Sequence, residues 1–238
     1  PIFSLLILKT CFANESTQYF LEILHLIMKK LNRDGLLDEI RKNLFRFRFI
    51  ERLLPSEGKI EKLKKYYEDL RREFKYLTDD PQYWLQYAMC FIMHNDLDKA
   101  QQKLYTAYEK AEKSNYDVTK IDNQQARLFL KKASRTDINI EEAVDLFFRA
   151  NKLLTKQRND TYKYKIMMDY KDFIDARFSS FNQEQWNQII MHCKKQLETL
   201  NFIISKDRFK EQKIYEDCKM IFEEIMQRNR AETIINSK

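Results

Sequence analysis

The sequence predicts an all-α fold in which antiparallel helical hairpins stack as an α-solenoid or pack as a bundle. Apolar residues recur at the spacing of one helix face along nearly the whole chain. The 238 residues include only two glycines and three prolines, and the many turns of a sheet protein depend on these residues. The expected helices are joined by short connections, which place neighbouring helices antiparallel.

The first region, residues 1–78, is expected to be helical and to continue a larger chain, because it begins without Met. Gly35 is placed to cap a helix over 16–31, and Pro55 follows a helix over 36–54. A third helix over 59–77 carries apolar residues at alternating spacings of three and four, which predicts a narrow seam against one partner helix. The seam comprises Ile60, Leu63, Tyr67, Leu70, Phe74 and Leu77.

The middle region, residues 79–157, begins at a strong helix start. Asp80 supplies the acidic cap and Pro81 the favoured first helical residue. The helices expected here span 81–94, 97–113, 119–133 and 140–156.

The third region, residues 158–238, is read as C-terminal helices. Its last ten residues, 229–238, are mostly polar and are expected to fray. The helices expected before them span 162–181, 183–204 and 209–228.

An internal repeat relates two helices of the middle region at an offset of 43 residues. Each helix carries two alanines seven residues apart on its apolar face. Small side chains at these positions allow the two helices of a hairpin to approach closely. The matching faces are Leu97, Ala100, Leu104, Ala107 and Ala111 in one helix and Ile140, Ala143, Phe147, Ala150 and Leu154 in the other.

The segment from Trp84 to Ala107 resembles a tetratricopeptide repeat. Asn95 stands where that motif usually has a turn glycine, and Asn tolerates left-handed backbone. The second unit, 124–154, fits in its first helix only if residues 135–138 are an insertion, since Ala126 is otherwise too far from Ala143. An ordinary helical bundle with one accidental match is the alternative to a repeat stack. The repeat packing positions are Trp84, Ala88, Phe91, Ala100, Leu104, Ala107, Ala143, Phe147 and Ala150.

Residues that could serve in catalysis or metal binding are scattered through the sequence. The three histidines lack cysteine or carboxylate ligands at metal spacing, and no Gly-rich phosphate loop occurs. The four cysteines lie apart in apolar helical stretches and read as reduced core residues, which fits a cytoplasmic protein. We expect no catalytic, cofactor or metal site, hence no enzyme, and no membrane span.

Two candidate partner surfaces emerge. In the first, arginine alternates with phenylalanine over 41–52, and its charged residues are Arg41, Arg46, Arg48 and Arg52. These arginines could surround a helix whose phenylalanines lie in the core, contact another protein, or bind the phosphates of a nucleic acid. The net charge is +7, but both signs are interleaved, which is typical of solvated helix faces rather than of a nucleic-acid stripe.

The second candidate surface follows from the repeat. In tetratricopeptide stacks the first helix of each hairpin lines the inner groove, and the resemblance maps this lining onto Gln82, Leu85, Met89 and Ile92. Either a neighbouring helix covers these residues, which we favour, or they form an apolar groove for a partner.

Three stretches in this order, 80–88, 107–111 and 121–127, are similar to the C-terminal tetratricopeptide-like region of large bacterial antiviral defence proteins. Those proteins couple an effector, sirtuin-like in some, to a STAND-type or related P-loop NTPase. The resemblance implies a non-catalytic sensor or regulatory module that binds a phage protein or its own upstream domains, with a possible homo-oligomer formed through the parent protein. The parent would be the NTPase, and this segment has no P-loop motif. A basic helical RNA- or DNA-binding domain is the alternative.

Overall fold

The computed structural model describes residues 58–236 except 74, 115, 157–159 and 207–211. Within these ranges the chain is all-α with no strand, which confirms the predicted fold class. The elements are α5 (Lys59–Glu73), the 3₁₀ helix η1 (Lys75–Asp79), α6 (Pro81–Met93), α7 (Leu97–Glu112), α8 (Thr119–Ala133), α9 (Ile140–Leu154), α10 (Asp160–Met167), α11 (Tyr170–Arg177), the 3₁₀ helix η2 (Phe178–Ser180), α12 (Gln183–Lys206) and α13 (Gln212–Asn236).

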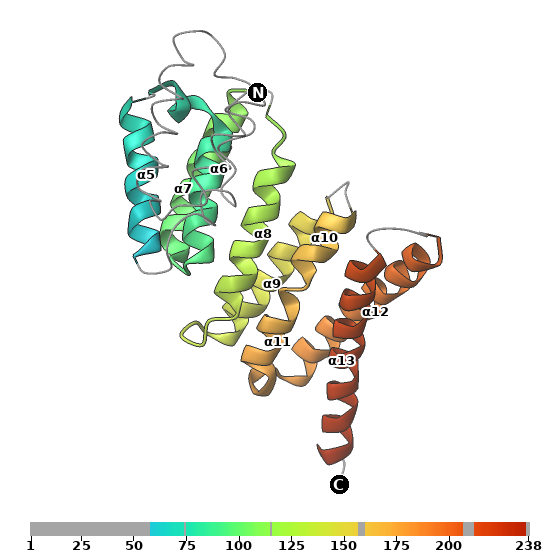
Figure 1. Cartoon of the computed structure of the whole chain (residues 1–238). Helices are drawn as coiled ribbons and strands as arrows, with labels where there is room; N and C mark the ends of the chain where they lie inside the picture. Colours follow the sequence, from blue (N-terminus) through green and yellow to red (C-terminus); the bar gives the residue numbers. More distant parts are fainter. Residues whose placement is uncertain (1–57, 74, 115, 157–159, 207–211, 237–238) are drawn as a thin grey trace, which may run out of the picture.

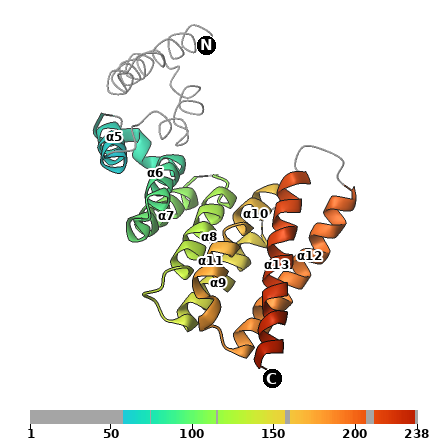
Figure 2. The ribbon, with the colours of Figure 1, turned by 60° about the horizontal axis from the view of Figure 1, so that its bottom comes forward.

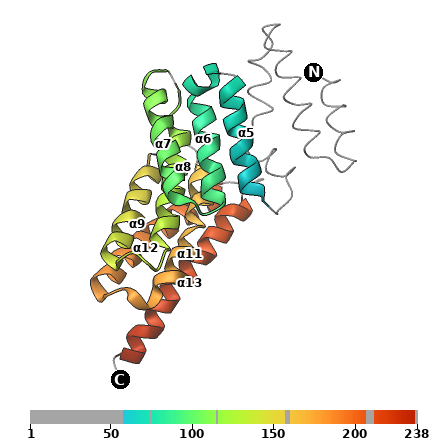
Figure 3. The same cartoon turned by 90° about the vertical axis from the view of Figure 1, so that its left-hand side faces the viewer.

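The helices follow one another across the molecule in chain order. Figure 1 shows α5, α6 and α7 at one end, α8 in the middle, and α12 and α13 at the opposite end. The side view in Figure 3 separates the same two ends. Helices that are consecutive in the sequence form the closest pairs, α6 with α7, α8 with α9 and α12 with α13. This order is that of a stack of hairpins.

Helix caps and a turn residue close by in the sequence determine the first hairpin, α6–α7. The Asp80 carboxylate accepts a hydrogen bond from the Gln82 amide, so the predicted cap is present. The three-residue linker, 94–96, turns at Asn95, whose φ is +59°. Asn95 is the one non-glycine residue with positive φ in the described ranges, as the sequence analysis expected for the position usually held by glycine. Asp96 then caps α7 through the Lys99 amide.

The second hairpin, α8–α9, repeats the core of the first and lengthens its linker. Asn139 caps α9 through the Glu142 amide, so the 43-residue offset extends to the cap. Ala88 precedes Ala100 by 12 positions, whereas Ala126 precedes Ala143 by 17. The difference comes from a six-residue linker, 134–139, and from α8 being 15 residues long where α6 has 13. Residues 135–138, the insertion that the repeat would require, lie in this longer linker.

Two apolar cores run through the described chain and meet at α8. Ile121 and Leu128 of α8 belong to the core of α5–α7. Phe129, Leu130 and Ala133 of the same helix belong to the core that continues to α13. Figure 2 shows α8 between the α6–α7 pair and helices α9 to α13. The cores therefore divide within α8, and the predicted regions 79–157 and 158–238 share one of them.

Several predicted helix boundaries are wrong. The helix expected over 162–181 is interrupted at Met168 and Asp169, and its last residues form η2. The helix expected over 59–77 ends at Glu73, and the indole of Trp84 donates a hydrogen bond of 2.7 Å to the Thr78 carbonyl beyond it. The terminal residues expected to fray continue α13 to Asn236. The helices predicted over 16–31 and 36–54 lie outside the described residues.

Candidate functional site

The residues predicted to pack the repeat are all interior. Each of the nine is at most 8% exposed. Ala88, Ala100, Ala107, Ala143 and Ala150 are fully buried, as close approach of paired helices requires. These positions hold the two hairpins together, so they are not available to a partner.

The groove predicted on α6 is covered. Leu85 and Ile92 are 3% and 1% exposed and belong to the core of α5–α7, and Met89 packs against that core. The Gln82 side chain accepts a hydrogen bond from the Tyr116 hydroxyl. The prediction of an open apolar groove is wrong for Leu85 and Ile92, and the covering alternative is the one the structure shows. Arg41, Arg46, Arg48 and Arg52 lie outside the described residues.

A pocket of about 380 Å³ lies where the two hairpin linkers meet the start of α11. We call it the linker pocket. The second linker forms much of its wall, the C-terminal turn of α8 and Asn95 of the first linker contribute, and two carboxylates come from the α10–α11 turn and α11. Its lining residues are Asn95, Leu130, Lys131, Ser134, Arg135, Thr136, Asp137, Asp169 and Asp172.

Arg177, the last residue of α11, fixes the second linker. Its side chain is 6% exposed and donates hydrogen bonds to three carbonyls, those of Ala133 (3.3 Å), Arg135 and Ile138 (2.8 Å). A buried guanidinium needs such acceptors, and a linker without regular structure needs donors for its carbonyls. Residues 134–138 are therefore held in shape from a helix about forty positions later in the chain.

The charges of the linker pocket are unevenly compensated. Arg135 and Asp137 form a two-point ion pair with each other, which satisfies both. Asp169 has one long contact, 3.4 Å to Arg127, and its pKa is raised because burial outweighs the attraction of Arg127 and Lys131. Asp172 makes no ion pair with any described residue. Asp172 thus faces the pocket without an ion pair to any described residue, while the cationic Lys131 lines the same pocket.

Two buried thiols lie in the core that continues from α8 to α13, which we call the second core, and both have raised pKa values. Burial raises the pKa of the Cys193 thiol to about 12. Burial and the nearby charge of Asp217 raise that of Cys218 to about 12, and this thiol contacts the Tyr164 carbonyl at 2.9 Å. Both thiols are protonated at neutral pH, and a thiol is a poor nucleophile in that form.

His192 packs at the edge of the same core and is partly buried. Its Nε2 lies 3.3 Å from the Tyr170 hydroxyl, and its ring meets that of Phe147 edge to face at 5.9 Å. Burial, together with Lys163 and Lys195, lowers the pKa of His192 to about 4. The imidazole is neutral at physiological pH and contributes aromatic contacts at the edge of the core.

Comparison with known proteins adds no family. Neither the family models, nor the curated proteins, nor the solved structures compared with this chain match it. In the described ranges no set of three or more His, Cys, Asp or Glu side chains is placed to hold a metal ion. No helix there combines the length and the apolar character needed to cross a membrane.

Sequence analysis did not single out Asp169 and Asp172, which line the linker pocket, or Arg177, which holds its wall. All three fall in a stretch that was predicted to be one continuous helix, so none was expected near a helix end. One signal pointed toward the site, because the mismatch between Ala126 and Ala143 located the insertion that forms the pocket wall.

Proposed function

We propose that this chain is a non-catalytic protein-interaction module, with the linker pocket as part of its binding surface. The observation that carries the proposal is the placement of polar groups. The two thiols with raised pKa values are buried in the core and the imidazole with a lowered pKa packs at its edge, whereas incompletely paired charges line a pocket at the surface. Such a surface recognises a partner, and loops joining rigid elements are common positions for recognition.

The finer proposal is a C-terminal sensor or regulatory domain of a bacterial anti-phage NTPase in the cytoplasm. It rests on the resemblance of residues 80–88, 107–111 and 121–127 to such regions. The module would bind a phage protein, or dock on upstream domains of its parent and so control assembly. A stack of hairpins suits this role because it presents its linkers along one edge.

Direct binding tests this proposal. The 238-residue chain is immobilised, and purified phage structural proteins are passed over it one at a time. We expect at least one to bind with a Kd on the order of micromolar or tighter, the range of specific protein contacts. A chain with Tyr105→Ala, an exposed position on α7, is the matched control and should bind equally. The absence of binding to every phage protein and to the upstream domains would contradict the proposal.

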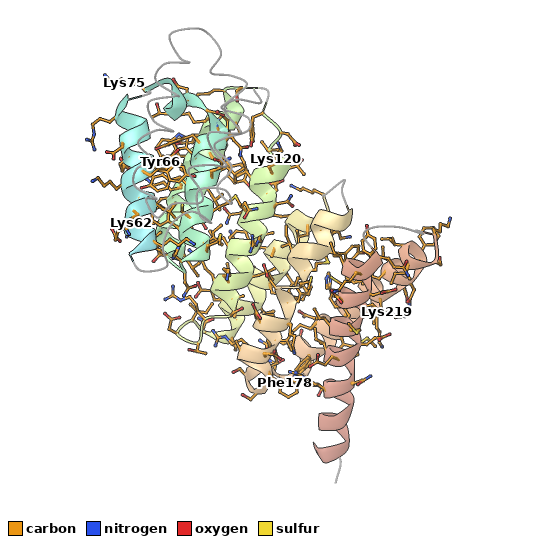
Figure 4. All side chains as sticks on the ribbon, in the orientation of Figure 1. Lys62, Tyr66, Lys75, Lys120, Phe178 and Lys219 are labelled. Carbon is orange, nitrogen blue, oxygen red and sulfur yellow. The ribbon has the colours of Figure 1, made fainter. Side chains whose placement is uncertain are left out.

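A nucleic-acid function is the second candidate, favoured by one observation. Lys62 and Lys65 are exposed on α5 and form no ion pair with any described residue. Figure 4 shows Lys62 directed away from the molecule and Tyr66 directed toward α6. Binding to phosphates would weaken steeply with salt, so a salt titration of RNA and DNA binding separates the candidates. Nucleic-acid binding that is undetectable, or that does not weaken between about 50 and 200 mM salt, would contradict the nucleic-acid function.

A further inference from the structure

We propose that the α12–α13 hairpin binds the same hairpin of a second copy of this chain through its outward side, so that two copies form a symmetric dimer. None of the residues that line the linker pocket belongs to α12 or α13. The inference is therefore independent of the proposed partner protein. It rests on exposed apolar side chains, on the charges beside them and on the size of the surface.

Three exposed apolar side chains point away from the core on these two helices. Met191 and Phe202 of α12 are 70% and 59% exposed, and Met220 of α13 is 59% exposed. Met191 and Phe202 are 11 residues apart, about three helical turns, so they lie on one side of α12. The opposite sides of both helices pack into the second core through Trp186, Ile189, Cys193, Leu200, Tyr215, Cys218, Phe222 and Ile225. The three exposed side chains thus share one surface of the hairpin, which we call the outer face.

The end of a hairpin stack normally has a polar surface. Each hairpin inside a stack is covered by the next one, and a polar outer side of the terminal hairpins keeps the stack soluble. Helices α12 and α13 are the last pair in the described chain, and Figure 1 shows them at one end of it. Three of the six large apolar side chains exposed in the described residues belong to this pair. Apolar side chains gathered at such a position are typical of an interaction surface.

Pairing of the two helices determines which residues lie level on the outer face. Helices α12 and α13 pack closely as a hairpin joined by residues 207–211, so residues equally far from the middle of that connection lie at about the same height. Met220 is then level with Glu198, roughly midway between Met191 and Phe202 of α12.

This spacing makes the outer face complementary to itself. A two-fold axis that runs parallel to the helices, between α12 and α13, places α12 of one copy on α13 of the other at the same height. Met220 of each copy then inserts between Met191 and Phe202 of the other copy. Side chains of one helix that fill the spaces on a facing helix are the usual way in which helices pack.

The charges of the outer face match under the same axis. Lys195 of α12 is exposed and forms no ion pair with any described residue. Glu223, which is level with it on α13, has one long contact, 3.9 Å to Lys219. The axis places Lys195 of each copy opposite Glu223 of the other. Among exposed side chains, lysines exceed glutamates by one on α12, and glutamates exceed lysines by one over residues 212–228 of α13. Opposite charges across a contact favour this partner over others.

The outer face is large enough for a dimer contact. Residues 212–228 of α13 extend over about 25 Å, and two packed helices are about 20 Å wide. Two such faces would bury about 1,000 Å² in total, which reaches the lower limit of specific interfaces. We therefore expect a reversible dimer with a Kd on the order of ten micromolar.

Sedimentation velocity of the 238-residue chain tests the dimer directly. We expect the sedimentation coefficient to rise from the monomer value to the dimer value between about 1 and 200 μM protein. A chain that stays monomeric over this range would overturn the proposal. Assembly beyond two copies would also overturn it, because a two-fold contact uses the same surface of both copies and closes at the dimer.

A substitution in the outer face locates the contact. Met220→Lys should weaken the dimer at least tenfold, because it places an ammonium group in the apolar part of the contact. Met93→Lys is the matched control, since Met93 is a methionine of α6 that is 47% exposed, and it should leave the Kd unchanged. Circular dichroism should show the same helix content in both variants. A Met220→Lys chain that dimerises as well as the Met93→Lys chain would overturn the proposal.

A charge exchange tests the two-fold arrangement. Lys195→Glu and Glu223→Lys should each weaken the dimer about fivefold, because each places like charges opposite one another twice in the dimer. The chain that carries both substitutions should regain most of the lost affinity, since opposite charges then face each other again. A double variant that is weaker than either single variant would overturn this arrangement.

Discussion

The α6–α7 and α8–α9 hairpins have the same core and different linkers. Both pair helices through two buried alanines seven residues apart, and both cap the second helix with an Asp or Asn side chain. The first linker turns in three residues at Asn95, whereas the second takes six and relies on Arg177. Helix pairing in this chain is therefore a local property, while the pocket depends on parts of the chain far apart in sequence.

The largest expected effect tests whether the two cores are equivalent. Phe147→Ala should reduce the free energy of unfolding by about 3–5 kcal/mol, since it empties a fully buried site. Phe147 stacks on Phe173 and contacts Tyr170, both at 4.8 Å between ring centroids. Leu104→Ala, at the matching position of the first hairpin, should cost about 2–5 kcal/mol.

Urea unfolding followed by circular dichroism measures both variants. Tyr105→Ala, at a residue that is 64% exposed, is the control and should change the free energy of unfolding by less than about 0.5 kcal/mol. A smaller loss for Phe147→Ala than for Leu104→Ala would break the comparison, because the second core would then be the looser one.

Acid should act on the second core through His192. Its pKa is about 4 in the folded chain and 6.5 as the reference value, so between these pH values the unfolded chain binds the proton and the folded chain does not. Stability is therefore full above pH 6.5 and falls as the pH drops toward 4, by at most about 3 kcal/mol. Lys163 and Lys195 act in the same direction, since their positive charges oppose protonation of His192.

The pH effect is measured as the difference in unfolding free energy between the unsubstituted chain and His192→Gln at pH 7.5 and pH 4.5. We expect the substituted chain to lose less stability on acidification. Parallel pH dependence in the two chains would show that His192 is not the group responsible.

The linkers can be compared by removing what holds each one. Arg177→Met keeps the length of the side chain but leaves buried carbonyls of the second linker without donors, which should cost about 2–3 kcal/mol. Amide hydrogen exchange should speed up over 134–139 and remain unchanged over 94–96. Equal acceleration in both linkers would mean that Arg177 supports the whole stack and not one linker.

The smallest expected effect concerns the first linker. Asn95→Ala should cost about 1 kcal/mol because alanine is strained at a φ of +59°, whereas Asn95→Gly should be nearly neutral. Thr136→Ala in the second linker should change the free energy of unfolding by less than about 0.5 kcal/mol, since that position does not have positive φ. Thermal unfolding of the three variants measures the contrast, and equal losses for the two Asn95 variants would contradict it.

Local sequence signals predicted what is local in the structure. The helix over 119–133 has the predicted bounds, α6 begins at Pro81, and Asn95 adopts the left-handed turn. Each depends on a cap, a proline or an amphipathic face within a few residues. The buried alanine pairs were predictable for the same reason, since the 43-residue offset is visible in the sequence alone.

The features that were missed depend on tertiary contacts. Nothing between 162 and 181 is a glycine or a proline, so no local signal marks the break at Met168 and Asp169. At that break Asp169 contacts Arg127, and Arg177 at the end of α11 bonds the second linker. Whether Leu85 and Ile92 were covered could not be settled from one helix, because the answer depends on which neighbour packs there. A pocket formed by three separate stretches of the chain has no signature in any one of them.

The position of α8 has a consequence for how the chain can be cut. Opposite sides of α8 pack against different neighbours. Leu128 belongs to the core of α5–α7, and Leu130 belongs to the core that continues to α13. A truncation just before or just after α8 would expose one apolar side of this helix, or the neighbours that it covers, to water. Fragments with such exposed apolar surfaces tend to aggregate. The two halves should consequently melt together as one unit, and shortened versions made to find the minimal binder should keep residues 119–133 together with both of their flanks.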